Sequence, residues 1–147
     1  NVDGVENVSM WMPVDPVPAE STLEFWAGSH RGAWLMPRTF LTEQAAWFPE
    51  GSLAEIPDIE ADRGAFDIRG WALEPGDAVF FHMLTAHHAY GVPGASRRRV
   101  FSLRFLGDDA RHAPRGWRTS PPFDGLADEL PPGAPMDHPL FPILRER

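Results

Sequence analysis

Proline and glycine recur along this chain so often that few stretches could continue as a long helix. There are 16 Pro and 13 Gly among 147 residues. Proline removes a backbone donor and breaks a helix interior, whereas glycine favours turns. One short helix is predicted around Thr42 to Phe48, where Thr42 can cap the first turn and Pro49 ends it. Elsewhere the pattern predicts short strands joined by turns and loops.

Strand-like segments alternate with turn signals over most of the chain. The predicted strands cover residues 8–14, 22–27, 66–73, 77–82, 85–90 and, most clearly, 98–106. Pro49 to Gly64 is predicted to be a surface loop, and the Pro-rich chain from Pro114 onward a tail without regular structure. Many short strands separated by turns are typical of a β-sandwich or barrel. The length suits a single domain over residues 1–147, with a regular core at about 8–110 and the tail at 114–147.

Charge and cysteine content exclude several classes of function. The net charge is −8 and every basic side chain is Arg or His, so an acidic surface would repel a nucleic-acid backbone. The chain has no Cys, which excludes disulfides and Cys-ligated metals and is compatible with the cytoplasm, where we expect the protein. The longest uncharged run, Ala78 to Ser96, contains three His, a Pro and two Gly, so no membrane span is predicted.

The predicted strand 98–106 presents two chemically different faces. Side chains alternate along a strand, so Arg98, Ser102 and Arg104 share one face with Val100. The opposite face carries Phe101, Leu103 and Phe105, which we expect in the core. The arginine face would meet either water, which is the usual environment of charged faces, or a polar cavity.

The six histidines do not contain a complete metal motif. A non-haem iron(II) site needs two His and one carboxylate, often as His-x-Asp/Glu plus a distant His, and no His here is followed two positions later by Asp or Glu. His87 and His88 would point to opposite faces of a strand, so a zinc site there is not expected. Arg98 follows His87 by eleven residues, which would place both on neighbouring antiparallel strands. Its guanidinium could bind a carboxylate through two hydrogen bonds.

Several short motifs stand in an order and spacing that together are specific. They are Asn1 to Gly4 with Val8 to Val17, Thr22 to Arg31 with its Gly28-Ser29-His30 turn, Leu73 to Asp77, Thr85 to His87, Ser96 to Asp109, and His138 to Pro142. In this respect the chain resembles the phytanoyl-CoA dioxygenase family of iron(II)- and 2-oxoglutarate-dependent oxygenases. The resemblance extends over nearly all of the sequence.

The resemblance implies roles for three residues. His87 would be the distal metal ligand, Arg98 would hold the distal carboxylate of 2-oxoglutarate, and Trp11 would line the cofactor pocket. Two positions depart from the family pattern: Val92 replaces an Asn that often follows the metal His, and Ala89 replaces a Ser that sometimes touches the cofactor. The family's His-x-Asp pair, which supplies the other two iron ligands, would lie upstream of the first residue.

The implied fold is mostly β, a double-stranded β-helix (jelly roll, cupin-like) that is N-terminally incomplete. The implied function is an iron(II)- and 2-oxoglutarate-dependent dioxygenase that uses O2 to hydroxylate a small organic molecule, this chain alone being inactive. The alternative is a cupin-like domain without a catalytic metal that binds a small molecule or has a structural role. We expect no nucleic-acid or membrane partner, and exposed strand edges would allow a homo-oligomer.

Overall fold

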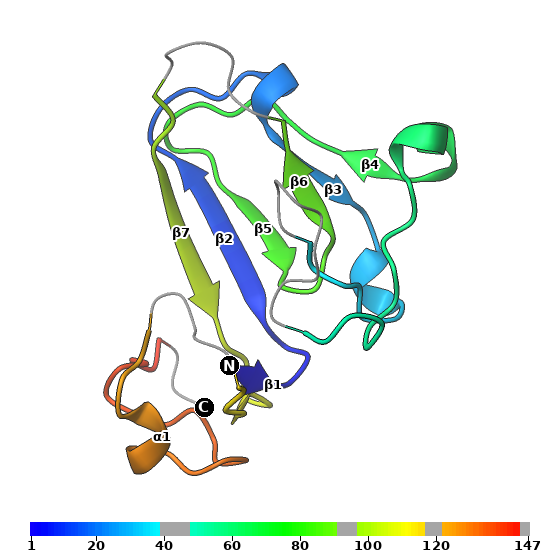
Figure 1. The fold of residues 1–147 in the computed structure, drawn as a ribbon. Coiled ribbons are helices and arrows are strands. Elements are labelled where there is room, and N and C mark those ends of the chain that lie inside the picture. Colours follow the sequence, from blue (N-terminus) through cyan, green and yellow to red (C-terminus); the bar gives the residue numbers. More distant parts are fainter. Residues whose placement is uncertain (39–47, 91–96, 117–121, 145–147) are drawn as a thin grey trace. The chain divides into compact units, whose positions relative to one another are not determined.

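The computed structural model describes residues 1–38, 48–90, 97–116 and 122–144, and this part of the chain is mostly β with antiparallel sheets (Figure 1). Two compact units are distinguished by their internal contacts: residues 1–8 with 104–147, and residues 9–103. The strands are β1 (Val2–Asp3), β2 (Val8–Pro13), β3 (Leu23–Trp26), β4 (Ile68–Arg69), β5 (Val79–His82), β6 (His87–Ala89), β7 (Val100–Phe105) and β8 (Arg111–His112). The helices are the 3₁₀ segments η1 (Ala19–Ser21), η2 (Ser29–Arg31) and η3 (Glu60–Ala65), and the α-helix α1 (Leu126–Glu129).

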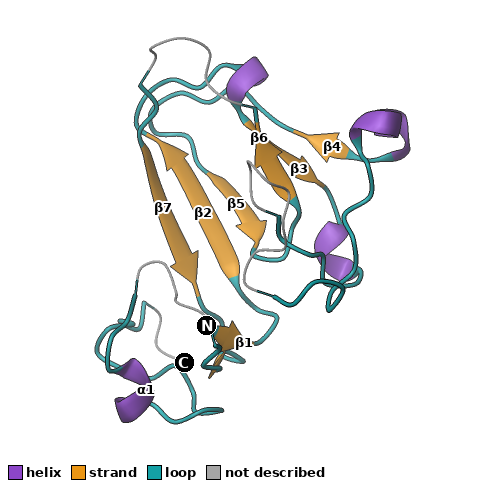
Figure 2. Cartoon of the chain, viewed as in Figure 1, coloured by secondary structure: helices purple, strands orange, loops and turns teal. Residues whose placement is uncertain are grey.

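The unit of residues 9–103 contains two three-stranded sheets (Figure 2). One has the strand order β5-β2-β7 and the other β4-β3-β6. On β2 the odd positions are turned inward, because Ser9 is 2% exposed and Pro13 is fully buried. Phe25 on β3 and Phe81 on β5 lie with their ring centroids 4.8 Å apart, so the two sheets pack against each other through these aromatic rings.

The core of this unit is small and centres on a few apolar side chains. Val17, Phe25, Met36 and Leu73 are each at most 8% exposed. Val17 and Leu73 also exchange both backbone hydrogen bonds, at 2.8 and 2.9 Å, which joins the loop after β2 to the segment before β5. Hydrophobic burial and backbone pairing therefore stabilise the same junction.

The other unit is built around the pairing of β1 with β8. Val2 pairs with His112 and Asp3 with Arg111 in antiparallel register. The Asp109 carboxylate accepts hydrogen bonds from the backbone N–H groups of Val5 (2.5 Å) and Glu6 (3.1 Å), which closes the turn after β1. Around this pairing, Ala110, Ala113, Leu126 and Leu130 supply the buried apolar side chains.

Most predicted strands are present, although shorter than expected. The strands predicted at 8–14, 22–27 and 98–106 correspond to β2, β3 and β7, while the one at 66–73 is reduced to the two residues of β4. The pair β1–β8, the 3₁₀ segments and α1 within the tail were not predicted. The helix predicted around Thr42 to Phe48 falls outside the described residues, apart from Phe48. The jelly-roll topology and the single domain stay predictions.

The prediction that Phe101 and Leu103 lie in the core is wrong. Phe101 is 49% exposed and Leu103 is 37% exposed. Their strand, β7, is the outermost strand of its sheet among the described residues, so it has a neighbouring strand on one side alone. Alternation separates the two faces of a strand, but it does not state which face another layer covers. Among the helices that the structure describes, none has the length and apolar character needed to cross a membrane.

Candidate metal and co-substrate site

Strand β6 places two adjacent histidines in different environments. In its antiparallel pairing with β3, His87 lies opposite Phe25 and His88 lies opposite Glu24. Residues directly opposite each other on paired strands project to the same face of the sheet. His87 therefore shares the face of the buried Phe25, and His88 shares the outer face with Glu24. The prediction that the two imidazoles point to opposite faces is confirmed.

The His87 ring is oriented by a hydrogen bond and by two aromatic neighbours. Its Nδ1 lies 2.8 Å from the Thr85 carbonyl oxygen, which can only accept, so Nδ1 carries the proton. The ring stacks against Phe25 with centroids 5.9 Å apart and meets Phe81 edge-on at 4.9 Å. In this tautomer Nε2 carries the lone pair. A backbone carbonyl on one nitrogen and a lone pair on the other is the usual arrangement of a metal-binding histidine.

Arg98 is half-buried, and its Nη1 donates a hydrogen bond of 2.5 Å to the carbonyl oxygen of Ser21. Ser21 lies four residues before Phe25, which is the strand partner of His87. Four residues of extended chain span about 13 Å. A guanidinium has five N–H donors, so this single bond leaves capacity for a carboxylate. Trp11 is half-buried on β2 and, by alternation, shares the inward face of Ser9 and Pro13.

The structure brings some of the predicted site residues together and leaves others apart. His87 helps to line a cavity of about 390 Å³, together with Phe25, Glu24 and His88. Within the described residues, neither Arg98 nor Trp11 is part of that lining. The prediction that His87 and Arg98 lie on neighbouring antiparallel strands is wrong, because β6 pairs with β3 while β7, which follows Arg98, pairs with β2 in the other sheet. The convergence of His87, Arg98 and Trp11 on one cavity stays a prediction.

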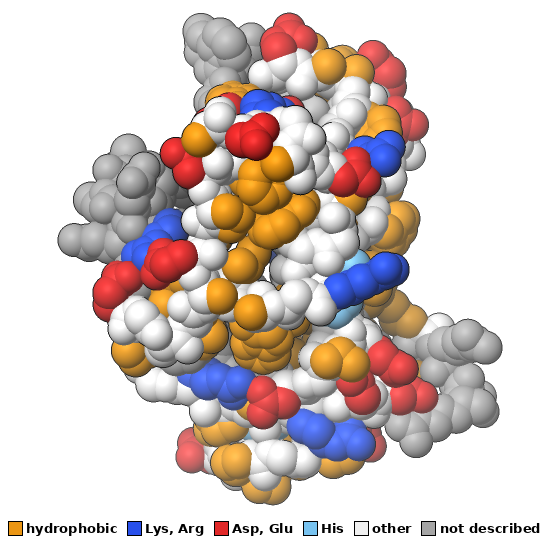
Figure 3. Space-filling view, turned by 90° about the vertical axis from the view of Figure 1, so that its right-hand side faces the viewer, with side chains coloured by type: hydrophobic (Ala, Val, Ile, Leu, Met, Phe, Trp, Pro, Cys, Tyr) orange, Lys and Arg blue, Asp and Glu red, His pale blue; other side chains and the backbone are white. Residues whose placement is uncertain are grey.

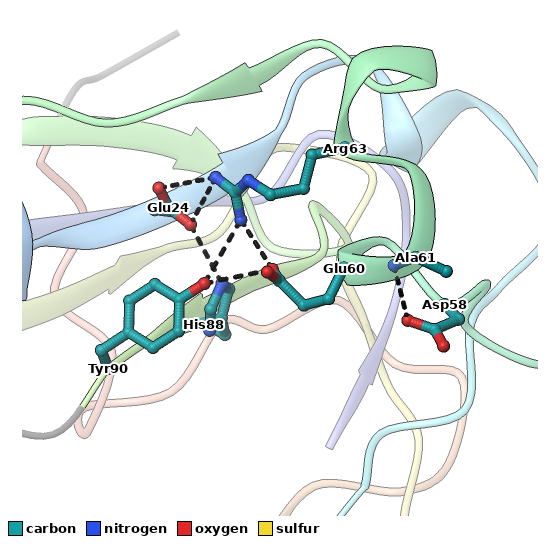
Figure 4. Close-up of polar contacts among 7 residues, drawn as sticks. All are labelled: Glu24, Asp58, Glu60, Ala61, Arg63, His88 and Tyr90. Atoms are coloured by element: carbon teal, nitrogen blue, oxygen red, sulfur yellow. Dashed lines mark hydrogen bonds and ion pairs between the residues drawn. The ribbon is translucent and has the colours of Figure 1, made fainter.

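The cavity is bordered by a polar cluster that the sequence did not reveal (Figure 4). Arg63 donates two hydrogen bonds to the Glu24 carboxylate, at 2.9 and 3.0 Å, and one of 2.6 Å to Glu60. His88 lies 3.2 Å from Glu24, and the Tyr90 hydroxyl donates to Glu60 at 3.1 Å. These contacts join η3 to strands β3 and β6. The apolar part of the lining comes from β3, from Ile68 on β4, and from Ile56, Pro57 and Ile59.

The charges of this cluster stabilise one another. Hydrogen bonds from Arg63, followed by the Tyr90 hydroxyl, hold the pKa of Glu60 below its usual value. Hydrogen bonds to Glu60 and Glu24 raise the pKa of Arg63. Figure 3 shows the side on which β4 and η3 lie, with hydrophobic side chains gathered among acidic and basic ones. The arrangement fixes the segment around η3 through charge-assisted hydrogen bonds.

A second pair of histidines lies outside the predicted site. The His30 and His82 rings stack with centroids 4.8 Å apart. Burial, and then the neighbouring His82, lower the pKa of His30, so His30 stays neutral at pH 7. The Nδ1 of His82 accepts a hydrogen bond from the Leu84 N–H, which leaves the proton on Nε2.

The donor set decides how well the chain suits iron(II). His87 fits one position of a two-His, one-carboxylate site, because its Nε2 offers a lone pair. Among the described residues, however, no group of three His, Asp or Glu side chains is placed to hold an ion. The residues described here therefore do not form a complete iron site.

Comparisons with known proteins agree with the motif order. The family model of phytanoyl-CoA dioxygenase matches residues 3–100. A search of curated proteins finds no match. Among solved structures, the chain is similar to SnoK, described as a non-heme alpha-ketoglutarate-dependent carbocyclase from nogalamycin biosynthesis, with a TM-score of 0.64 and 23% identity over 96% of this chain and 50% of that one. It is also similar to SnoN, described as a non-heme alpha-ketoglutarate-dependent epimerase from the same biosynthesis, with a TM-score of 0.61 and 25% identity over 95% of this chain and 47% of that one.

The chain thus spans about half the length of these two solved structures, and it shares their fold over almost all of its own length. The matched residues 3–100 include Trp11 on β2, His87 on β6, and Arg98 just before β7. On this basis the chain belongs to the phytanoyl-CoA dioxygenase family.

Proposed function

We propose that this chain carries the distal metal imidazole and the co-substrate arginine of an iron(II)- and 2-oxoglutarate-dependent dioxygenase. Its substrate would be a small organic molecule that the enzyme hydroxylates. The observation that carries the proposal is the contact of 2.8 Å between His87 Nδ1 and the Thr85 carbonyl oxygen. Because a carbonyl can only accept, we infer that Nδ1 carries the proton and that Nε2 is available as a ligand. Family membership supplies the reaction class.

Each residue has a separate task in this proposal. Phe25 and Phe81 contact the His87 ring and orient it, although His87 as a whole is exposed. Arg98 would bind the distal carboxylate of 2-oxoglutarate, exchanging part of its contact with Ser21 for a bidentate pair. Trp11 would form an apolar wall of the co-substrate pocket. Bound iron(II), with 2-oxoglutarate and O2, would supply the oxidising chemistry.

The two other iron ligands would come from residues outside this sequence. Two things support this part of the proposal: the family's iron ligands include a His-x-Asp pair, and the described residues offer His87 without a second and third donor beside it. A lone imidazole gives weak and unselective metal binding, so the 147-residue chain should neither bind iron(II) tightly nor consume 2-oxoglutarate by itself.

Anaerobic iron(II) titration tests this assignment. We expect micromolar binding and succinate formation from a longer chain that includes the residues preceding this sequence, and neither from the 147-residue chain. Losing a residue that only hydrogen-bonds to a metal ligand lowers metal affinity by up to roughly 100-fold. Because His87 would be a ligand itself, His87→Ala in the longer chain should lower iron affinity by more than that. His88→Ala is the matched control and should leave iron affinity unchanged, because its ring lies beside Glu24 on the outer face. Tight iron binding by the short chain, or equal effects of the two variants, would contradict the proposal.

Binding of 2-oxoglutarate tests the role of Arg98. Losing a charge-assisted bidentate pair from a partly buried site costs roughly 2–5 kcal/mol, or about 30- to 4000-fold in affinity. Arg98→Ala should weaken co-substrate binding to the longer chain by such a factor, and Arg98→Lys should restore part of it, since an ammonium keeps the charge without the planar fork. Unchanged affinity in Arg98→Ala would refute this role.

The alternative function is a cupin-like domain that binds a small molecule, or has a structural role, without a catalytic metal. The incomplete donor set of the described residues favours it. The iron titration separates the two candidates, because the alternative predicts no tight iron binding even in the longer chain.

A further inference from the structure

A buried serine far from His87 in the sequence contacts the chain directly before it. Ser29 lies in η2, is 7% exposed, and follows Gly28, whose positive φ of 83° turns the chain after β3. The Ser29 Oγ accepts a hydrogen bond of 2.9 Å from the backbone N–H of Ala86, across 57 positions of sequence. On its other side, the Ala86 carbonyl accepts a bond of 2.9 Å from the Trp26 N–H.

The N–H that Ser29 binds belongs to the same peptide group as the carbonyl that holds His87. The Ala86 nitrogen and the Thr85 carbonyl are the two ends of one amide, and that carbonyl accepts the hydrogen bond from His87 Nδ1 at 2.8 Å. A trans peptide is planar, so its N–H and C=O point in opposite directions, and fixing one direction fixes the other. The contacts form a continuous relay from Ser29 Oγ through the Thr85–Ala86 peptide to the His87 imidazole.

We propose that Ser29 is a positioning residue that selects the Nδ1–H tautomer of His87 and thereby keeps Nε2 available as a metal ligand. The relevance of this role to iron rests on the proposed function, whereas the relay itself does not. Without the hydroxyl, the Ala86 N–H would lose its acceptor in a partly buried place. Rotation of this peptide toward another acceptor would then withdraw the Thr85 carbonyl from Nδ1. In addition, when the N–H of an amide donates a hydrogen bond, the amide is polarised and its carbonyl oxygen becomes a stronger acceptor.

Nuclear magnetic resonance on the 147-residue chain without metal tests the relay. At pH 8, where an ordinary imidazole is neutral, the ¹⁵N shifts of His87 should show the Nδ1–H tautomer in the unmodified chain. In Ser29→Ala we expect His87 to shift toward the Nε2–H tautomer that free histidine prefers. The Ala86 amide should exchange its hydrogen about 2- to 12-fold faster, as expected for one lost hydrogen bond.

Two controls separate positioning from general destabilisation. Ser9→Ala removes a hydroxyl that is 2% exposed on β2, outside the relay, and should leave the His87 tautomer unchanged. His88, whose ring contacts Glu24, is an internal reference that should not respond to any of these variants. Ser29→Cys keeps the side-chain size with a weaker sulfur acceptor and should shift His87 in the same direction by less.

Three results would overturn the proposal: an Nε2–H tautomer of His87 in the unmodified chain, an unchanged tautomer in Ser29→Ala, or an equal response to Ser9→Ala. The first measurement needs no variant, and Ser29→Cys, which keeps a side chain of similar size, tests the role of the hydroxyl even if Ser29→Ala does not fold. Because no iron is present, these results are independent of the titration that tests the proposed function. An intact relay with no iron binding in the longer chain would refute the proposed function alone.

Discussion

Replacing Phe25 by Ala should remove the aromatic contact that joins the two sheets. Phe25 is 5% exposed and touches three aromatic rings, with centroids 4.8 Å from Phe81, 5.9 Å from His87 and 6.2 Å from Trp71. Truncating a buried Phe to Ala costs about 3–5 kcal/mol, because the lost transfer free energy is increased by the cavity left behind. For a chain of this length, such a loss lowers Tm by about 10–20 °C.

Urea denaturation measures this effect directly. With a slope of about 2 kcal/mol/M, the midpoint should fall by roughly 2 M. Phe101→Ala is the matched control: it removes the same atoms from a ring that is 49% exposed and should cost less than about 1 kcal/mol. A loss below 1 kcal/mol in Phe25→Ala, or an equal loss in both variants, would refute the assignment of Phe25 to the core and of Phe101 to the surface.

Two further predictions concern an ion pair and a glycine. Hydrogen bonds from Arg99 lower the pKa of Asp15 from 3.8 to about 2, so the pair stabilises the fold above pH 4 and loses this effect as the pH falls toward 2. A carboxyl NMR titration should give a midpoint near 2 for Asp15 that moves up toward 3.8 in Arg99→Ala, and an unchanged midpoint would contradict the pairing. Gly107→Ala would place a Cβ onto the Glu6 carbonyl oxygen and should cost about 1–3 kcal/mol in thermal unfolding, whereas Gly116→Ala, with nothing within 4 Å of its Cβ, should be close to neutral.

Local patterns predicted those parts of the fold that depend on neighbouring residues. Proline and glycine spacing located most strands, and alternation placed His87 and His88 on opposite faces, as their pairing with Phe25 and Glu24 shows. The same rule gave the wrong environment for Phe101 and Leu103, which are exposed. Alternation states which side chains share a face, but it gives no information on whether another layer packs against that face.

The parts of the candidate site that the sequence did not reveal depend on contacts between distant segments. Glu24 and Arg63 are 39 positions apart, and Ser29 and Ala86 are 57 apart. In the sequence, Glu24 cannot be distinguished from an ordinary solvated charge. Its place beside His88 becomes visible only once the register of β3 with β6 is known. The Gly28-Ser29-His30 turn is recognisable as a motif in the sequence, but only the structure shows that its hydroxyl accepts a hydrogen bond from Ala86.

The pairing of β1 with β8 has a consequence for the order in which the chain folds. Among the residues that the structure describes, Val2 pairs with His112, and the Asp109 carboxylate that binds the Val5 N–H lies 104 positions further along the chain. Closing so long a loop costs conformational entropy before the contacts repay it, and such long-range contacts slow folding. During synthesis, the residues of β1 must therefore wait unpaired until more than a hundred others have left the ribosome, whereas β3 can pair with β6 much sooner. During this interval β1 is most open to proteolysis and to pairing with the strands of another molecule.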